Sequence, residues 1–219
     1  MDIIKKLAQE LTIKEEQAKA AVQLIDEGNT IPFIARYRKE MTGALNDETL
    51  RNLHERLLYL RNLEEKKEQV INAITEQDKM TDDLKKKILA AEALVAVDDL
   101  YRPYRPKKQT RATKAKEKGL EPLANILLLQ ATSKSMEEEA QSFVDEAKGV
   151  VNAKEALAGA KDIIAEMIAD KADYRKSIRN CTMKQGRLVV KAKDEKAESV
   201  YEMYYDFSEE LSKITGYRV

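Results

Sequence analysis

The segment from Tyr101 to Lys118 contains the residues of this chain whose types and spacing best suit contact with a polyanion. Its eight basic side chains are Arg102, Arg105, Lys107, Lys108, Arg111, Lys114, Lys116 and Lys118. Tyr101 and Tyr104 lie among them, and Pro103 and Pro106 prevent the segment from beginning as a helix. Cations that displace counterions, with rings on which bases stack, are typical of a nucleic-acid contact. A solvated connector whose tyrosines pack on the protein body is an equally good interpretation, because basic runs are common.

A second group of cations lies in residues 31–43. Its members are Arg36, Arg38 and Lys39, which flank Tyr37 on or just after a short predicted helix. They could bind phosphates. The favoured alternative is that Arg36 and Arg38 pair with acids such as Glu40 or Asp47 and fix this corner to the next helix, since arginine suits planar ion pairs.

Other reactive side chains do not combine into a catalytic or metal-binding pattern. Adjacent aspartates at 98 and 99 point in different directions on a helix, so they do not converge on one ion. His54 has no second histidine or cysteine near it, and Cys181 has no histidine to activate it. No glycine-rich phosphate loop is present in the sequence. We therefore expect a protein that is not an enzyme and uses no cofactor, metal or small-molecule substrate.

The composition predicts a helical protein with much exposed surface. Of 219 residues, 36% are charged and 5% are aromatic, and glycine and proline are scarce. The formal net charge is zero, which excludes a globally basic nucleic-acid binder and leaves only local charge asymmetry. Cys181 alone cannot form an internal disulfide, and no stretch reads as a signal peptide or a membrane span. These features predict a cytoplasmic location.

The elements that must position these residues are predominantly α-helices in an elongated array. Residues 1–45 predict short helices that resemble a helix-turn-helix unit, with Thr12 and Glu15 as a capping box. A helix of nearly thirty residues follows from about 47 to 76, because leucines recur there on a seven-residue repeat that Glu64 and Lys67 interrupt. An apolar, buried helix is expected over 121–130. A short β segment competes with helix over 186–193.

Several unusual strings in order carry a family resemblance. They are DEGNTIPFIARYRKEMTG at 26–43, DDLYRPYRPK at 98–107 and AKEKGLEPLA at 115–124. With the long helix and the aromatic segment at 204–208, they resemble the N-terminal region of the bacterial Tex family of transcription accessory proteins.

The resemblance implies a helical, multi-domain protein that binds RNA or DNA without catalysis. Family members continue into RNase-H-like, helix-hairpin-helix and OB-fold domains, which are not recognisable in these 219 residues. We therefore expect N-terminal helices over 1–45 and a helical body over 46–219. The resemblance also implies RNA polymerase or ribosome-associated transcription machinery as a partner. No membrane partner is expected. The alternative function is a protein-interaction scaffold that docks RNA polymerase or the protein's own C-terminal domains.

Overall fold

The computed structural model describes residues 2–106, 108–194 and 196–216, and most of these residues are helical. The chain divides into two compact units, residues 1–101 and residues 102–219. The predominantly helical fold class predicted from the sequence is confirmed. The sequence-based division at residues 45 and 46 stays a prediction.

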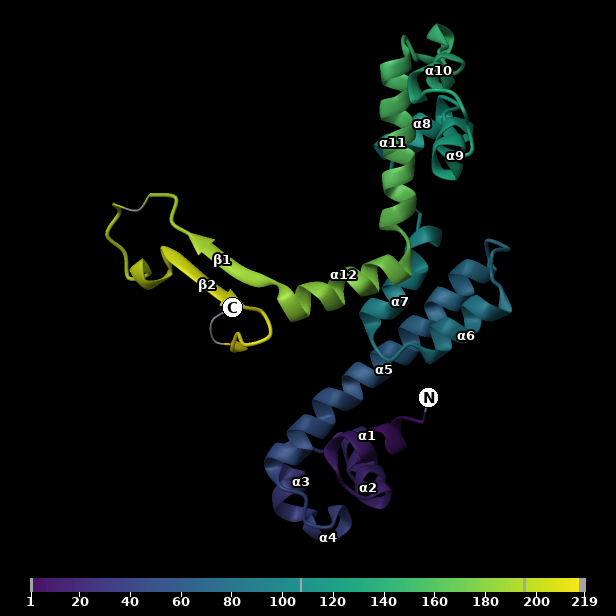
Figure 1. Ribbon diagram of the computed structural model, residues 1–219. Helices are drawn as coiled ribbons and strands as arrows, with labels where there is room; N and C mark the ends of the chain where they lie inside the picture. Colours follow the sequence, from purple (N-terminus) through teal and green to yellow (C-terminus); the bar gives the residue numbers. More distant parts are fainter. Residues whose placement is uncertain (1, 107, 195, 217–219) are drawn as a thin grey trace. The chain divides into compact units, whose positions relative to one another are not determined.

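The first unit is built from consecutive helices joined by short turns (Figure 1). They are α1 (Ile3–Leu11), α2 (Glu15–Asp26), α3 (Ile31–Tyr37), α4 (Lys39–Thr42), α5 (Asp47–Thr75), α6 (Asp82–Ala90) and α7 (Leu94–Tyr101). The long predicted helix is confirmed as α5, whose N-cap Asn46 accepts a hydrogen bond from the Thr49 amide at 2.7 Å. Its first turn carries Asp47 and Glu48, which the positive end of the helix dipole favours.

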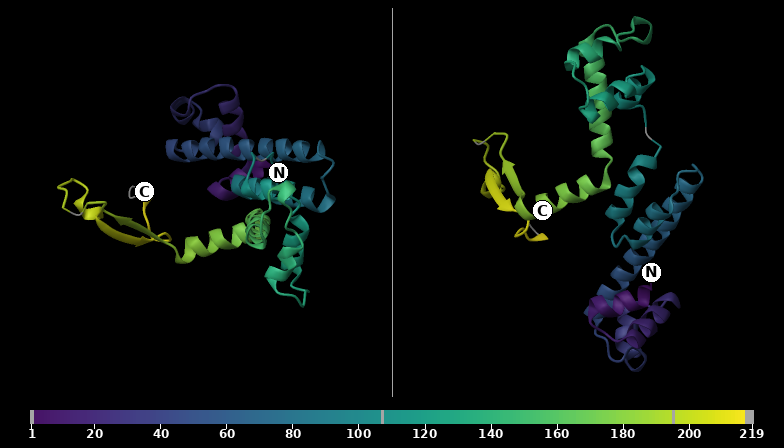
Figure 2. Two further views of the ribbon diagram at one scale, coloured as in Figure 1. Left: turned by 90° about the horizontal axis from the view of Figure 1, so that it is seen from above. Right: turned by 45° about the vertical axis from the view of Figure 1, so that its right-hand side comes forward.

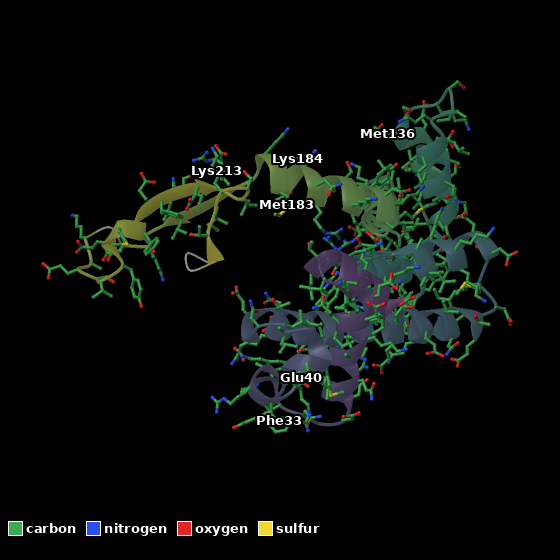
Figure 3. All side chains as sticks on the ribbon, turned by 90° about the horizontal axis from the view of Figure 1, so that it is seen from below. Phe33, Glu40, Met136, Met183, Lys184 and Lys213 are labelled. Atoms are coloured by element: carbon green, nitrogen blue, oxygen red, sulfur yellow. The ribbon has the colours of Figure 1, made fainter. Side chains whose placement is uncertain are left out.

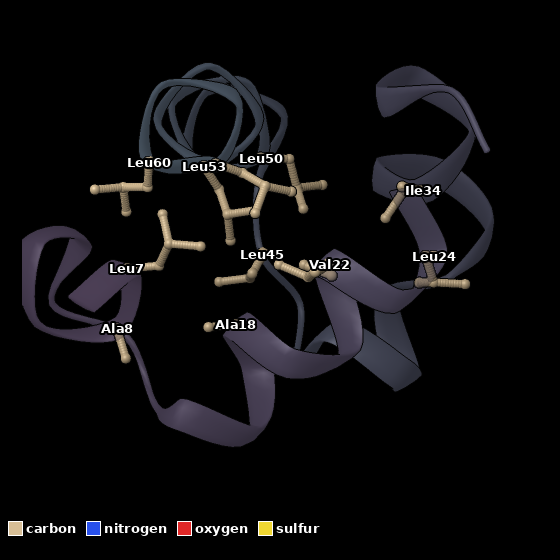
Figure 4. Close-up of a cluster of buried hydrophobic side chains, with 12 residues drawn as sticks. Leu7, Ala8, Ala18, Val22, Leu24, Ile34, Leu45, Leu50, Leu53 and Leu60 are labelled. Atoms are coloured by element: carbon tan, nitrogen blue, oxygen red, sulfur yellow. The ribbon is translucent and has the colours of Figure 1, made fainter. Parts of the chain in front are cut away.

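The leucines of the first half of α5 form one wall of the hydrophobic core (Figure 4). Leu50, Leu53, Leu57 and Leu60 are buried against side chains from α1, α2 and α3. The opposing buried side chains are Leu7, Ala8, Ala18, Ala21, Val22, Leu24 and Ile34. The heptad pattern therefore serves packing within this chain.

The second half of α5 contacts α6 and α7, and its buried stripe shifts there to Leu63, Val70 and Ile74. Lys67 lies within this stripe and is 2% exposed. Its Nζ donates to Glu64 Oε1 at 2.8 Å and to the Leu89 carbonyl at 2.9 Å. The lysine is tolerated in the interior because its ammonium group is both paired and hydrogen-bonded.

The turn between α1 and α2 differs from the sequence prediction. Thr12 ends α1 in a left-handed conformation with φ of 55°, so the predicted capping box of Thr12 with Glu15 is wrong. Instead, Gln17 Oε1 accepts a hydrogen bond from the Lys14 amide at 3.1 Å. A capping residue must be extended, which the left-handed Thr12 is not.

The second unit begins with the 3-10 turn η1 (Arg102–Tyr104), and its remaining elements follow in chain order. They are α8 (Arg111–Glu117), α9 (Glu121–Leu129), α10 (Met136–Gln141), η2 (Glu146–Lys148), α11 (Ala153–Ala169), α12 (Ala172–Gln185), β1 (Arg187–Lys191), η3 (Glu202–Tyr204) and β2 (Asp206–Glu210). Strands β1 and β2 pair antiparallel, with Val189 opposite Ser208, which confirms the β segment that the sequence left open.

Helix α11 is the centre of packing in this unit, and α8, α9 and α10 lie along it (Figures 1 and 2). The buried side chains are small, including Ala112 and Ala115 on α8 and Ala156 and Ala160 on α11. Gly159 permits this close approach, because a Cβ there would lie 2.4 Å from Leu120 Cδ1 and 3.2 Å from Ala115 Cβ. Helix α8 therefore has little freedom to move against α11.

Helix α9 is only partly buried, which corrects the sequence prediction. Leu123 and Ala124 are buried in the core, whereas Leu129 is 75% exposed. A run of apolar residues does not reveal which face a short helix buries. In the part of the chain that the structure describes, no helix is both long and apolar enough to cross a membrane.

Candidate nucleic-acid interface

The basic segment of residues 101–118 is not one continuous loop but includes the end of α7, the turn η1 and helix α8. Tyr101 ends α7, the 3-10 turn η1 follows directly, and Arg111–Glu117 form helix α8. Thr110 caps α8, since its Oγ1 accepts from the Thr113 amide at 3.1 Å while Thr113 Oγ1 accepts from the Thr110 amide at 2.7 Å. The two prolines delay the helix, and the threonine pair begins it.

Several cations of this segment are already engaged. Arg102 Nε donates to Asp170 Oδ1 at 3.0 Å. Lys116 Nζ lies 3.2 Å from Glu121 Oε1, and Lys118 Nζ donates to the Gly149 carbonyl at 2.7 Å. These contacts join parts of the second unit to one another. The three side chains therefore have a structural role, whether or not they also bind a ligand.

The other predicted contact residues before α8 differ in how far they are exposed to solvent. Tyr101 and Tyr104 are half-buried, and both, like the exposed Arg105, take part in interactions within the protein. Lys107 lies outside the described residues. The two rings are therefore less available for stacking than the sequence suggested.

Three cations on and just before α8 face solvent and form the basic surface of the second unit. The Arg111 side chain is 86% exposed, with its Nη2 3.5 Å from Asp162 Oδ1. Lys108 and Lys114 are exposed, and neither has an acidic partner among the described residues. A solvent-exposed pair such as Arg111–Asp162 contributes about 0–1 kcal/mol, so an incoming phosphate can compete with it. We call Lys108, Arg111 and Lys114 the α8 cations.

Two of the α8 cations, Arg111 and Lys114, border a hollow between α8 and α11. It is lined by Arg111, Lys114, Lys118, the backbone at 149–151, and the acids Glu155 and Asp162. Arg111, Lys114 and Lys118 follow helical spacing and share one side of α8. Close packing of Ala115 on α8 against Gly159 on α11 fixes the helix that carries these cations.

The second predicted cluster lies on the α3–α4 corner, where Phe33 and Glu40 are both found (Figure 3). The guanidinium carbon of Arg38 lies 5.0 Å from the Phe33 ring centroid, and that of Arg36 lies 5.9 Å from the Tyr37 centroid. The two rings are 5.3 Å apart and tilted. Such placement of a cation over a ring is favourable, since the ring face is electronegative.

The predicted ion pairs of this corner are absent from the described residues. Asp47 binds Arg51 instead, at 2.6 Å, and neither Arg36 nor Arg38 pairs with any described acid. The favoured alternative from the sequence, that these arginines pair with Glu40 or Asp47, is therefore wrong. Lys39 is also exposed without an acidic partner in the described chain. We call Arg36–Met41 the arginine corner.

Gln17, which sequence reasoning missed, and Gly43, at a break in the sequence pattern, hold the arginine corner in place. Gln17 Nε2 donates to the carbonyls of Thr42 and Gly43 at 3.2 and 3.0 Å. Gly43 has φ of 62°, and a Cβ on it would lie 2.6 Å from Gln17 Nε2. The glycine at a sequence break gave a signal for a left-handed turn, whereas no local pattern identified Gln17.

Two bidentate ion pairs fasten α1 and α2 onto α5 in the same unit. Arg56 Nη2 donates to Glu10 Oε1 at 2.9 Å, and Arg61 donates to both oxygens of Asp26 at 2.7 Å. The hydrogen bonds from these guanidinium groups lower the pKa of Glu10 and the pKa of Asp26 below their ordinary values. Among the residues described, no group of three or more His, Cys, Asp or Glu side chains is placed to hold a metal ion.

Comparison with known proteins identifies the same family over both units. Residues 1–75 match the Tex-like protein N-terminal domain, and residues 131–219 match the Tex central region-like family. The arginine corner lies inside the first match, whereas the α8 cations lie between the two matches.

Relatives extend the likeness along nearly the whole chain. Protein YhgF of Escherichia coli K12 is 45% identical over 215 residues, covering 97% of this chain and 28% of the relative. The transcriptional accessory protein Tex of Neisseria gonorrhoeae is 42% identical over 221 residues, covering 100% and 29%. A more distant human relative, S1 RNA-binding domain-containing protein 1, is 28% identical over 227 residues, covering 100% and 22%.

This chain thus spans less than a third of the length of these relatives. The two family matches and the Neisseria gonorrhoeae relative agree on a single assignment. The chain belongs to the Tex family.

Proposed function

We propose that this chain serves a transcription accessory protein as a non-enzymatic surface that binds single-stranded RNA or DNA. The observation that carries the proposal is the set of α8 cations, Lys108, Arg111 and Lys114, which face solvent on and just before a helix fixed to its unit. Cations in such a row can follow a phosphate backbone and release its counterions. Contacts of this kind position a strand without reading its sequence.

The relatives support the nucleic-acid part of the proposal through their names. One is called a transcriptional accessory protein, and another carries the name of an S1 RNA-binding domain. We extend both properties to this chain as part of the proposal. We also propose a cytoplasmic location and association with RNA polymerase or ribosome-associated transcription machinery.

Stacking adds less to this interface than the α8 cations do. Tyr101 and Tyr104 are half-buried and engaged within the protein, so a base can reach them only at a cost. Affinity then depends mainly on charge, and the same strand should bind as RNA or as DNA. Binding should be weak and strongly dependent on salt.

The test is a titration of fluorescein-labelled oligouridylate with the chain at several salt concentrations. Replacing Lys108, Arg111 and Lys114 together by alanine should weaken binding and flatten the plot of log affinity against log salt. For single strands each lost phosphate contact removes about 0.7 from the slope, so three contacts remove about 2.

A matched control removes the same charge from another part of the same unit. Lys176, Lys184 and Lys193 are exposed and have no acidic partner among the described residues, and Lys184 projects from α12 (Figure 3). Replacing these three by alanine should change the slope of log affinity against log salt by less than the loss of one phosphate contact would, about 0.7. An equal loss in both triple variants would mean that net charge alone matters, and an unchanged slope in the α8 variant would remove α8 from the interface.

A further inference from the structure

The arginine corner differs chemically from the α8 cations. It borders a depression whose lining includes Arg36, Tyr37, Arg38, Met41 and the two acids Glu27 and Glu40. Tyr37 is 60% exposed and Met41 is 51% exposed. Cations, an aromatic ring, a flexible apolar side chain and carboxylates thus meet at one small concave site.

This mixture suits a polypeptide better than a nucleic acid. Tyrosine, methionine and arginine are the residue types enriched in protein–protein interfaces. Protein–nucleic acid interfaces are instead strongly positive, with cations that contact phosphates. The hollow beside α8 is also lined by two acids, so the distinguishing groups at the corner are the exposed Tyr37 and Met41 side chains. The carboxylates of Glu27 and Glu40 can accept hydrogen bonds from the backbone amides of an extended peptide.

The cations of the corner determine the charge of the partner. Arg36 and Lys39 are exposed, and Arg36, Arg38 and Lys39 have no acidic partner among the described residues. A guanidinium group binds a carboxylate through two parallel hydrogen bonds, which fixes the orientation of the partner. An acidic partner would therefore satisfy groups that the chain itself leaves unpaired.

The corner is already rigid before a partner arrives. Gln17 holds the carbonyls of Thr42 and Gly43, and Arg38 Nη1 donates to the Tyr37 carbonyl at 3.2 Å. Arg38 also packs over Phe33. A surface that needs little reordering loses less free energy on binding, which favours recognition of a short segment.

We propose that the arginine corner binds an acidic polypeptide segment that presents one large apolar side chain. Arg36 and Lys39 bind carboxylates of the segment, and its apolar side chain contacts the Tyr37 ring and Met41. This site is separate from the α8 cations, and the proposal does not depend on nucleic-acid binding by α8.

The test is selection of a random peptide library displayed on phage against the immobilised full chain, followed by anisotropy with the enriched peptides made synthetically. Enriched sequences should place Asp or Glu on either side of an aromatic or long aliphatic residue. Replacing Tyr37 by alanine, or Arg36 by alanine, should weaken the peptide at least about tenfold, as expected for a central interface residue. Both side chains are exposed, so the variants should retain the helical circular dichroism of the parent.

Matched variants and a second ligand separate this site from its alternatives. Lys19 is exposed in the same unit without an acidic partner among the described residues, and Lys19→Ala should leave peptide affinity unchanged. Alanine at all three α8 cations should also leave it unchanged. The proposal is overturned if no acidic peptide is enriched, if Lys19→Ala matches Arg36→Ala, or if labelled oligouridylate rather than peptide loses affinity in Tyr37→Ala.

Discussion

The α8 cations and the arginine corner carry the same sign of charge but present it in different surroundings. Among the α8 cations, Lys108 precedes the helix, whereas Arg111 and Lys114 extend from it beside Glu155 and Asp162. Lys108 and Lys114 are unpaired by described acids, and the Arg111 side chain is almost fully exposed. The arginine corner sets its cations among two rings, a methionine and two carboxylates. Charge therefore does not by itself define the partner, because the groups around a cation determine whether a phosphate chain or a polypeptide fits.

The two surfaces also differ in what holds them. The α8 helix rests on small side chains of α11, where Gly159 allows close contact. The arginine corner is held by hydrogen bonds from one glutamine and by the leucine core beneath it. Each surface can therefore be disturbed through its own support while the other is left intact.

The largest effect is expected from emptying the core under the arginine corner. Leu53 is fully buried, and Leu53→Ala should lower the free energy of unfolding of the first unit by about 2–5 kcal/mol. Hydrogen exchange measured by mass spectrometry should rise across residues 2–101 and stay unchanged in α8 and α11. The reverse pattern is expected for Ile163→Ala, since Ile163 is buried in the second unit. If hydrogen exchange rose throughout the chain in both variants, the two surfaces would not be supported by separate hydrophobic cores.

Overpacking at Gly159 should affect the α8 side alone. A valine there would bring its Cβ within 2.4 Å of Leu120 Cδ1, which costs about 1–3 kcal/mol of stability. Because the added side chain also crowds Ala115 on α8, at 3.2 Å, we expect α8 to be displaced, so oligouridylate affinity should fall while the affinity for a corner-binding peptide stays the same. Gly216→Val is the matched control, because nothing lies within 4 Å of a Cβ at that glycine. Unchanged stability of Gly159→Val in urea would show that the helices separate easily.

Loss of the glutamine support should affect the arginine corner alone. Gln17→Ala removes two hydrogen bonds to the α4 turn and the acceptor of the Lys14 amide at the start of α2, for an expected cost of about 1–3 kcal/mol. Peptide affinity should fall several-fold because the corner is no longer held before binding, whereas oligouridylate affinity should not change. Gln69→Ala removes an exposed hydrogen bond on α5 and serves as the control. A corner peptide that binds Gln17→Ala normally would show that pre-organisation is unimportant.

The smallest effect concerns pH and is confined to the first unit. The hydrogen bonds from Arg56 lower the pKa of Glu10 below the ordinary value of a glutamate, so the pair stabilises the fold fully at pH values above that ordinary pKa. The stabilisation should be lost as the pH falls through the lowered pKa, with an amplitude of about 1 kcal/mol. Urea unfolding followed from neutral to acidic pH should show this loss, and Glu10→Gln should reduce it. A variant with the same acid dependence as the parent would assign the effect to other carboxylates.

Local patterns were sufficient for much of the fold. The leucine repeat predicted α5 almost to its ends, and the β segment near 186–193 was recognised as a competitor to helix. The pattern failed where a residue's role depends on distant contacts. Thr12 ends a helix instead of capping the next one, and Leu129 is exposed although its neighbours are apolar.

The candidate sites were predicted less completely than the fold. The sequence identified both groups of cations and Tyr37, but it favoured ion pairs at Arg36 and Arg38 that the described residues do not form. It did not find Asp170 and Asp162, which lie far along the chain and approach Arg102 and Arg111 only through packing. Gln17 escaped notice for the same reason.

The sequence by itself determined the helical class, the long leucine-bearing helix and the two places where cations gather with aromatic residues. These properties follow from periodicity and composition within a few turns of chain. Only the tertiary structure decided which cations are already paired, which rings stay exposed and which turn is held rigid. Those outcomes depend on contacts between residues dozens of positions apart, and no local pattern encodes such contacts.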